Sequence, residues 1–160
     1  LESSSGFQPM QFRQLEHALG RKRADIYSHY PHDLPGRAEA EQRLHEASRP
    51  DCFYDFLEHR GVTIPTKLRD QPETEGTVAN EAVQAGIAKL YRSDGRYVIL
   101  FELMIDLDEA TQEWRYRHFK IVERTIGDKH GTGGSLGVEF LKPTIFERVF
   151  PDLWAIRRQF

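Results

Sequence analysis

The sequence predicts an all-α fold, organised as a single helical domain over residues 1–160. Apolar residues recur three and four positions apart through most of the chain, as they do in helices that bury one side. Glycines and prolines separate these periodic segments, as is usual at helix ends. A chain of 160 residues can bury about 70 % of its unfolded surface, which is enough for one core.

Three helices are expected in the first half of the chain, over residues 7–19, 37–47 and 51–59. The first carries Phe12, Leu15 and Leu19 on one face and ends at Gly20. The second is rich in Ala, Glu, Gln and Arg, which favours a surface helix. Prolines and glycines favour loops that cross the surface over residues 31–36 and 62–77.

Four helices are expected in the second half, over residues 78–92, 96–126, 136–148 and 152–158. The β-branched and aromatic residues of segment 97–105 would also suit a buried strand. Helix is favoured because an apolar stripe runs on from this segment without a break. The stripe consists of Leu100, Leu103, Leu107, Ala110, Trp114, His118, Ile121 and Thr125. We expect this face to be buried, Arg115 to lie on the surface, and Glu113 to pair with Arg117.

His118 is the chemically distinctive residue of that stripe. A buried imidazole needs a partner, and two alternatives are open. In the first, His118 is a core histidine whose ring nitrogen bonds to a carbonyl group or a water molecule. In the second, it is an axial ligand to an iron porphyrin, for which one neutral histidine is sufficient.

A glycine-rich segment over residues 131–137 follows the longest predicted helix. Four glycines in seven residues indicate positive φ angles or the close approach of another group. Successive free amides suit an anion. The segment lacks the lysine of a phosphate loop and follows a helix, so a carboxylate is the better ligand, with the hydroxyl of Thr132 as a further donor. The alternative is a plain turn between two helices.

The net charge of −3 gives no electrostatic reason to expect binding to nucleic acid or to an anionic membrane. Cys52 is the only cysteine, so an internal disulfide is excluded and a reducing compartment is indicated. We expect Cys52 to be a small buried residue.

No segment has the pattern of a secretory signal or a membrane-spanning helix, so we expect a soluble, cytoplasmic protein. His29 and His32 form only a weak metal-site candidate, because Pro31 breaks the helix that would align them.

Two sequence blocks closely resemble the tryptophan 2,3-dioxygenase family. The first is SSGFQPMQFR over residues 4–13, and the second is WRYRH over 114–118 with GTGGS over 131–135. By this resemblance, the fold is the helical haem-binding domain of that family and His118 is the proximal ligand of haem b. Thr132 and Gly133 would bind the charged end of the substrate. Ser5 and Gly6 would line the pocket near haem and substrate.

The resemblance also implies an activity. Family members insert both atoms of dioxygen into L-tryptophan to give N-formylkynurenine, the first step of the kynurenine pathway, and are typically homotetramers. Alternatives are a related haem protein that acts on another aromatic substrate and a haem-binding domain without activity.

Nearly the whole chain takes part in the resemblance, but it corresponds to the C-terminal part of the family's longer polypeptide. The family's distal histidine and carboxylate-binding arginine precede the first block, so we expect an upstream N-terminal segment to complete the site. Phe12 replaces a tyrosine that many members carry.

Overall fold

The computed structural model describes residues 10–20, 33, 35–43, 45–69, 78–127 and 138–160. Within these ranges the structure consists of helices and connecting segments without a strand, which confirms the all-α prediction. In chain order the elements are α1 (Met10–Ala18), α2 (Arg37–Arg43), α3 (Arg49–Glu58), α4 (Thr66–Arg69), α5 (Glu81–Ser93), α6 (Gly95–Ile126), α7 (Val138–Leu141), the 3-10 helix η1 (Lys142–Phe146), α8 (Pro151–Ala155) and the 3-10 helix η2 (Ile156–Gln159).

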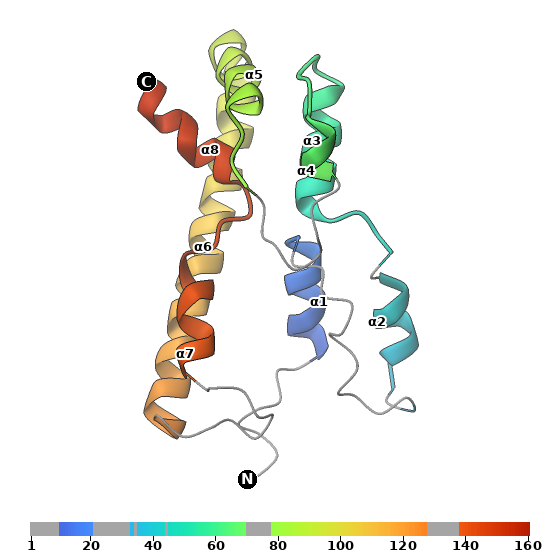
Figure 1. Ribbon diagram of the computed structural model, residues 1–160, viewed down its shortest axis with the longest axis vertical. Coiled ribbons are helices and arrows are strands. Elements are labelled where there is room, and N and C mark those ends of the chain that lie inside the picture. Colours follow the sequence, from blue (N-terminus) through green and yellow to red (C-terminus); the bar gives the residue numbers. More distant parts are fainter. Residues whose placement is uncertain (1–9, 21–32, 34, 44, 70–77, 128–137) are drawn as a thin grey trace.

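The long helix α6 runs along one side of the molecule, beside α5, α7 and α8 (Figure 1). Its 32 residues give a length of about 48 Å at 1.5 Å per residue. It begins where the Asp94 side chain caps it by accepting a hydrogen bond from the Arg96 amide at 2.8 Å, and it ends at Gly127, whose φ is 60°. Segment 97–105 is therefore helical, as the uninterrupted apolar spacing predicted.

Two apolar clusters hold the other helices against α6. The main core joins α3, α5, α6 and α8, with Phe53 as its centre: the ring of Phe53 meets Phe101 and Phe150 edge to face, at centroid distances of 6.1 and 5.4 Å. A smaller cluster joins α6 to α7 and η1 through Phe119, Val138 and Ile145. In Figure 1, α5 and α8 accordingly lie beside one half of α6 and α7 beside the other.

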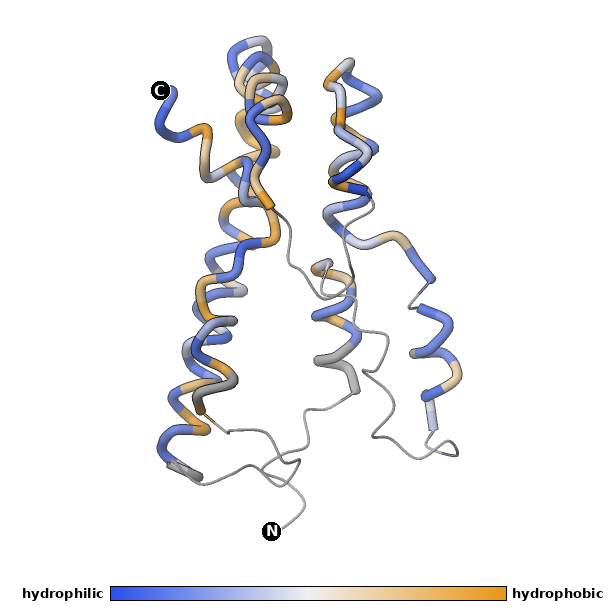
Figure 2. The backbone as a smooth tube through the Cα atoms, viewed as in Figure 1, coloured by the Kyte–Doolittle hydropathy of each residue, from blue (hydrophilic) through white to orange (hydrophobic). Residues whose placement is uncertain are grey.

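The buried face of α6 is not the one that the stripe predicted. Phe101, Asp108 and Arg115 are 0 %, 0 % and 5 % exposed, whereas Leu103 and Ile121 of the predicted face are 60 % and 61 % exposed. Apolar residues occur along the whole length of α6 (Figure 2). Periodicity shows that a helix face is apolar, but the packing of α5, α7 and α8 decides which face is buried. The expectation that Arg115 lies on the surface is wrong for the same reason.

Asp108 anchors the C-terminal segment to α6. Its buried carboxylate accepts hydrogen bonds from the amides of Val149 and Phe150, at 2.8 and 3.2 Å, and from the Trp154 indole nitrogen at 3.0 Å. Within the described residues 138–148, the helix expected over 136–148 is divided into α7 and η1 and ends at Phe146. Pro143 lacks the amide that an α-helix needs at this position, so the chain tightens into 3-10 geometry.

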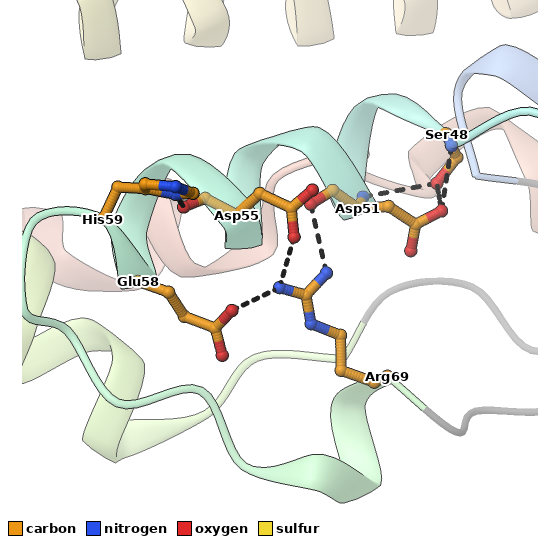
Figure 3. Close-up of polar contacts among 6 residues, drawn as sticks. All are labelled: Ser48, Asp51, Asp55, Glu58, His59 and Arg69. Atoms are coloured by element: carbon orange, nitrogen blue, oxygen red, sulfur yellow. Dashed lines mark hydrogen bonds and ion pairs between the residues drawn. The ribbon is translucent and has the colours of Figure 1, made fainter.

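Figure 3 shows how α4 folds back along α3. Ser48 and Asp51 form a capping box at the start of α3, and Arg69 of α4 reaches Asp55 at 2.6 Å and Glu58 at 2.8 Å. Segment 62–69 was expected to cross the surface. Instead it is part of the core, because its apolar residues pack inward: Val62, Ile64 and Leu68.

The remaining differences in the N-terminal half are local. Helix α1 ends at Ala18, two residues before Gly20, which is the predicted end and has a φ of 93°. Leu15 of its expected apolar face is exposed, while Leu19 is buried. Helix α2 is shorter than the expected 37–47. Cys52 is exposed rather than buried, because the neighbouring Phe53 and Tyr54 take the inward side of α3.

Candidate functional site

His118 lies between the buried and exposed faces of α6. Its side chain is half-buried, not fully buried as expected, and its ring stacks on Trp114 one turn earlier. The two rings are 5.2 Å apart between centroids and within 7° of parallel. This i,i+4 contact holds the imidazole plane against the helix surface, so the ring is restricted in orientation before any ligand binds.

Burial lowers the pKa of His118 below its usual value of 6.5. The imidazole is therefore predominantly neutral at neutral pH. A neutral imidazole is the form that binds a transition metal, since a protonated ring has no lone pair to donate. The environment of His118 thus favours the chemical state that an axial iron ligand requires.

A band of exposed apolar side chains runs along α6 on the side of Trp114. We call it the outer face of α6; it consists of Leu100, Leu103, Leu107, Trp114 and Ile121. Soluble monomers rarely expose a contiguous apolar surface of this kind unless it binds something. His118 lies at its inner edge, about 60° around the helix from the buried Arg115. A ligand of His118 would therefore meet apolar side chains over much of its area.

Arg115 is the polar centre of the buried side. Its guanidinium donates to the carbonyl oxygens of Thr144 and Glu147, at 3.3 and 2.8 Å, and pairs with the Glu16 carboxylate at 3.3 Å. Sequence reasoning missed this residue. A second stripe at three- and four-residue spacing could have identified it, but its polar and charged members are typical of a solvated face. This stripe runs through Phe101, Ile105, Asp108, Gln112, Arg115 and Phe119.

Several predicted site residues lie outside the described residues: Ser5, Gly6, Thr132 and Gly133, together with the His29 and His32 pair. Among the residues that the structure describes, His45 and His59 are exposed, and no group of three or more His, Cys, Asp or Glu side chains could hold a metal ion. Glu113 and Arg117 form the predicted ion pair at 2.6 Å. No helix in the described part of the chain has the length and apolar character needed to cross a membrane.

In its described residues, the chain is a helical protein with a half-buried histidine, His118, beside an exposed apolar helix face.

Comparison with known proteins identifies the family. A family model described as tryptophan 2,3-dioxygenase matches residues 67–160. The chain is 48 % identical over 157 residues to a tryptophan 2,3-dioxygenase of Herpetosiphon aurantiacus, covering 98 % of this chain and 60 % of the relative. The corresponding protein of Anaeromyxobacter sp. is 45 % identical over 157 residues, with 98 % and 59 % covered. That of Kineococcus radiotolerans is 41 % identical over 162 residues, with 99 % and 57 % covered.

The chain belongs to the tryptophan 2,3-dioxygenase family. It spans about 60 % of the length of these curated relatives.

Proposed function

We propose that this chain is part of a haem-dependent dioxygenase that cleaves the indole C2–C3 bond of L-tryptophan. The product is N-formylkynurenine, and the reaction is the first step of the kynurenine pathway. Both atoms of dioxygen enter the product, so substrate and dioxygen are its only reactants. Membership in the tryptophan 2,3-dioxygenase family carries this proposal.

His118 is the residue of this chain that would hold haem b by its iron. Three observations fit this role: the neutral imidazole, the Trp114 ring that fixes its orientation, and the apolar outer face beside it. A porphyrin is flat and mostly apolar, so burying it against such a surface is favourable without further charges. When bound, haem supplies the redox chemistry with dioxygen that amino-acid side chains lack.

The charged end of L-tryptophan would be held by the glycine-rich segment. We assign this role to the Thr132 hydroxyl and to the backbone amide of Gly133, with Ser5 and Gly6 lining the pocket near haem and substrate. Hydroxyl and amide donors suit a carboxylate, and a charge-assisted hydrogen bond is about twice as strong as a neutral one. Holding the amino-acid end orients the indole ring for attack at one bond.

A further segment would complete the active site. The chain spans about 60 % of its relatives' length, and the outer face of α6 is apolar yet exposed. We propose that an upstream N-terminal segment covers part of this face and supplies the remaining contacts to L-tryptophan. A cytoplasmic homotetramer would be the working form.

The test begins with an absorbance spectrum of the protein purified after haem-replete expression. The proposal predicts a Soret band, and a spectral response to L-tryptophan that tyrosine does not produce. N-formylkynurenine formation is then measured for the reduced protein, with and without an added upstream segment. We expect turnover only when that segment is present, since a missing substrate anchor can cost about a hundredfold in rate. Absence of haem, or a response to tyrosine alone, would refute the proposal.

A further inference from the structure

We propose that Arg115 is a positioning residue, which holds the parts of the tryptophan site in register with His118. This inference rests on the proposed function. It concerns a residue that touches neither haem nor substrate in the proposal. It acts through the segments to which its guanidinium is bonded.

The contacts of Arg115 join three separate elements. The residue belongs to α6, three positions before His118. One guanidinium nitrogen bonds the carbonyls of Thr144 in η1 and of Glu147 just after it, and the other pairs with Glu16 of α1. Residue 16 is 99 positions away in sequence. A side chain on α6 thus sets the distance of both α1 and η1 from the helix turn that carries His118.

Sequence adjacency relates these elements to the proposed site. Helix α1 begins at Met10, a few residues after Ser5 and Gly6. Helix α7 begins at Val138, directly after the glycine-rich segment, and leads straight into η1. The elements to which Arg115 is bonded are therefore the ones that anchor the chain just beyond each proposed substrate-binding piece.

Stability alone is a weak reason for a charged pair in this position. Arg115 is 5 % exposed and Glu16 is 7 % exposed, so both charges are removed from water at considerable cost. Replacing a buried ion pair with apolar residues of similar volume is often neutral or stabilising. What an apolar residue cannot supply is a set of directed bonds to two carbonyls and a carboxylate. Such bonds fix the positions of α1 and η1 relative to α6, whereas apolar packing alone would only keep these elements in contact.

The chemistry also requires arginine rather than any cation. A guanidinium presents donors in a rigid planar fork, which can reach acceptors on two segments at once. A lysine ammonium is a compact point charge, and its shorter reach cannot replace both nitrogens. Arg115→Lys is therefore expected to lose the positioning effect, although it keeps the positive charge.

Asp108 provides a matched control on the same helix. It lies seven residues before Arg115, is fully buried, and also accepts hydrogen bonds from distant parts of the chain. Its partners, however, all lie in segment 149–154, beyond η1. Asp108→Asn should thus destabilise the fold without altering the register between α1, α6 and η1.

The experiment compares Arg115→Met, Arg115→Lys, Glu16→Gln and Asp108→Asn with the wild type, as haem-loaded protein with the upstream segment added. Tryptophan affinity is measured from the haem spectral response, and the iron–imidazole stretching frequency by resonance Raman. For Arg115→Met we expect haem to be retained, a shifted stretching frequency, and tryptophan affinity weaker by about tenfold or more. Arg115→Lys should give no rescue. Asp108→Asn should lower the melting temperature but keep the wild-type affinity.

The outcomes separate the two proposals. The positioning role is refuted if Arg115→Met binds tryptophan as tightly as the wild type. It is also refuted if Arg115→Met and Asp108→Asn have equal melting temperatures and Arg115→Met weakens tryptophan binding no more than Asp108→Asn does. If Arg115→Met does not fold, Glu16→Gln decides, because it removes one charge while keeping the shape: weaker tryptophan binding supports the role and unchanged binding refutes it. A wild type without a Soret band or a tryptophan response would overturn both proposals together.

Discussion

On α6, charged residues are buried on one face and apolar residues are exposed on the other. We call the buried face, which carries Phe101, Asp108 and Arg115, the inner face of α6. The inner face contains Asp108 and Arg115, yet both are almost fully buried because their charged groups bond to backbone and side-chain partners. The outer face contains Leu103, Trp114 and Ile121, yet these residues are exposed. Burial on this helix follows the packing of other elements against it, not apolar character alone.

The inner face of α6 packs against α5, α7, η1 and α8. The outer face has the composition of a core surface and the exposure of a binding surface. His118 lies at the boundary between the two faces, so a group that it binds would also cover part of the exposed outer face.

The sharpest test of this comparison is His118→Ala. The variant should lose stable haem retention, because the iron loses its protein ligand on that side. The measurement is haem content and the Soret band after gel filtration. His45→Ala, a change at an exposed histidine, is the control and should retain normal haem content. Histidine-ligated haem in the His118→Ala variant would show that the ligand has been misassigned.

A pair of substitutions two residues apart, on opposite sides of α6, tests the two faces directly. Phe101→Ala on the inner face should lower the free energy of unfolding by about 3 to 5 kcal/mol, since it leaves a cavity in the main core. Leu103→Ala on the outer face should change it by only about 0.5 kcal/mol. Urea unfolding measures both. Similar losses in the chain alone would show that the outer face is already covered.

Thr132→Ala tests the proposed substrate contact. Removing one charge-assisted hydrogen bond costs about 1.5 to 3 kcal/mol. Tryptophan affinity should therefore fall roughly tenfold or more, while haem content stays normal. The spectral titration with L-tryptophan measures the affinity. An unchanged affinity would mean that the glycine-rich segment is a turn without a substrate role.

The smallest effect is expected from pH. In the haem-free folded protein, burial lowers the pKa of His118 below 6.5, so the unfolded chain takes up the proton first as pH falls. Stability should decline from pH 6.5 down to the folded pKa and then stop changing on this account; above pH 6.5 His118 should have no effect. Urea midpoints across this range, compared with those of His118→Ala, isolate the contribution. A slope that persists in His118→Ala would assign it to other groups.

Local features of the fold were predictable from sequence because their causes are local. Three features follow from residues within a few positions of one another: the helical state of 97–105, the end of α1 two residues before Gly20, and the Glu113–Arg117 pair. The family resemblance is of the same kind, since it rests on short sequence blocks, one over residues 4–13 and the other over 114–118 and 131–135. None of these predictions required knowledge of which distant residues pack against the helix in the core.

Only the tertiary structure decided which face of α6 is buried, and with it the roles of several residues. Arg115 is buried because Glu16 and the end of η1 bring acceptors to it, and segment 62–69 packs inward because α3 and α5 leave space for its apolar side chains. Cys52 is exposed because Phe53 and Tyr54 occupy the core side of α3. Each outcome depends on residues from elsewhere in the sequence. The three- and four-residue spacing along one helix contains no information about which distant residues will pack against it.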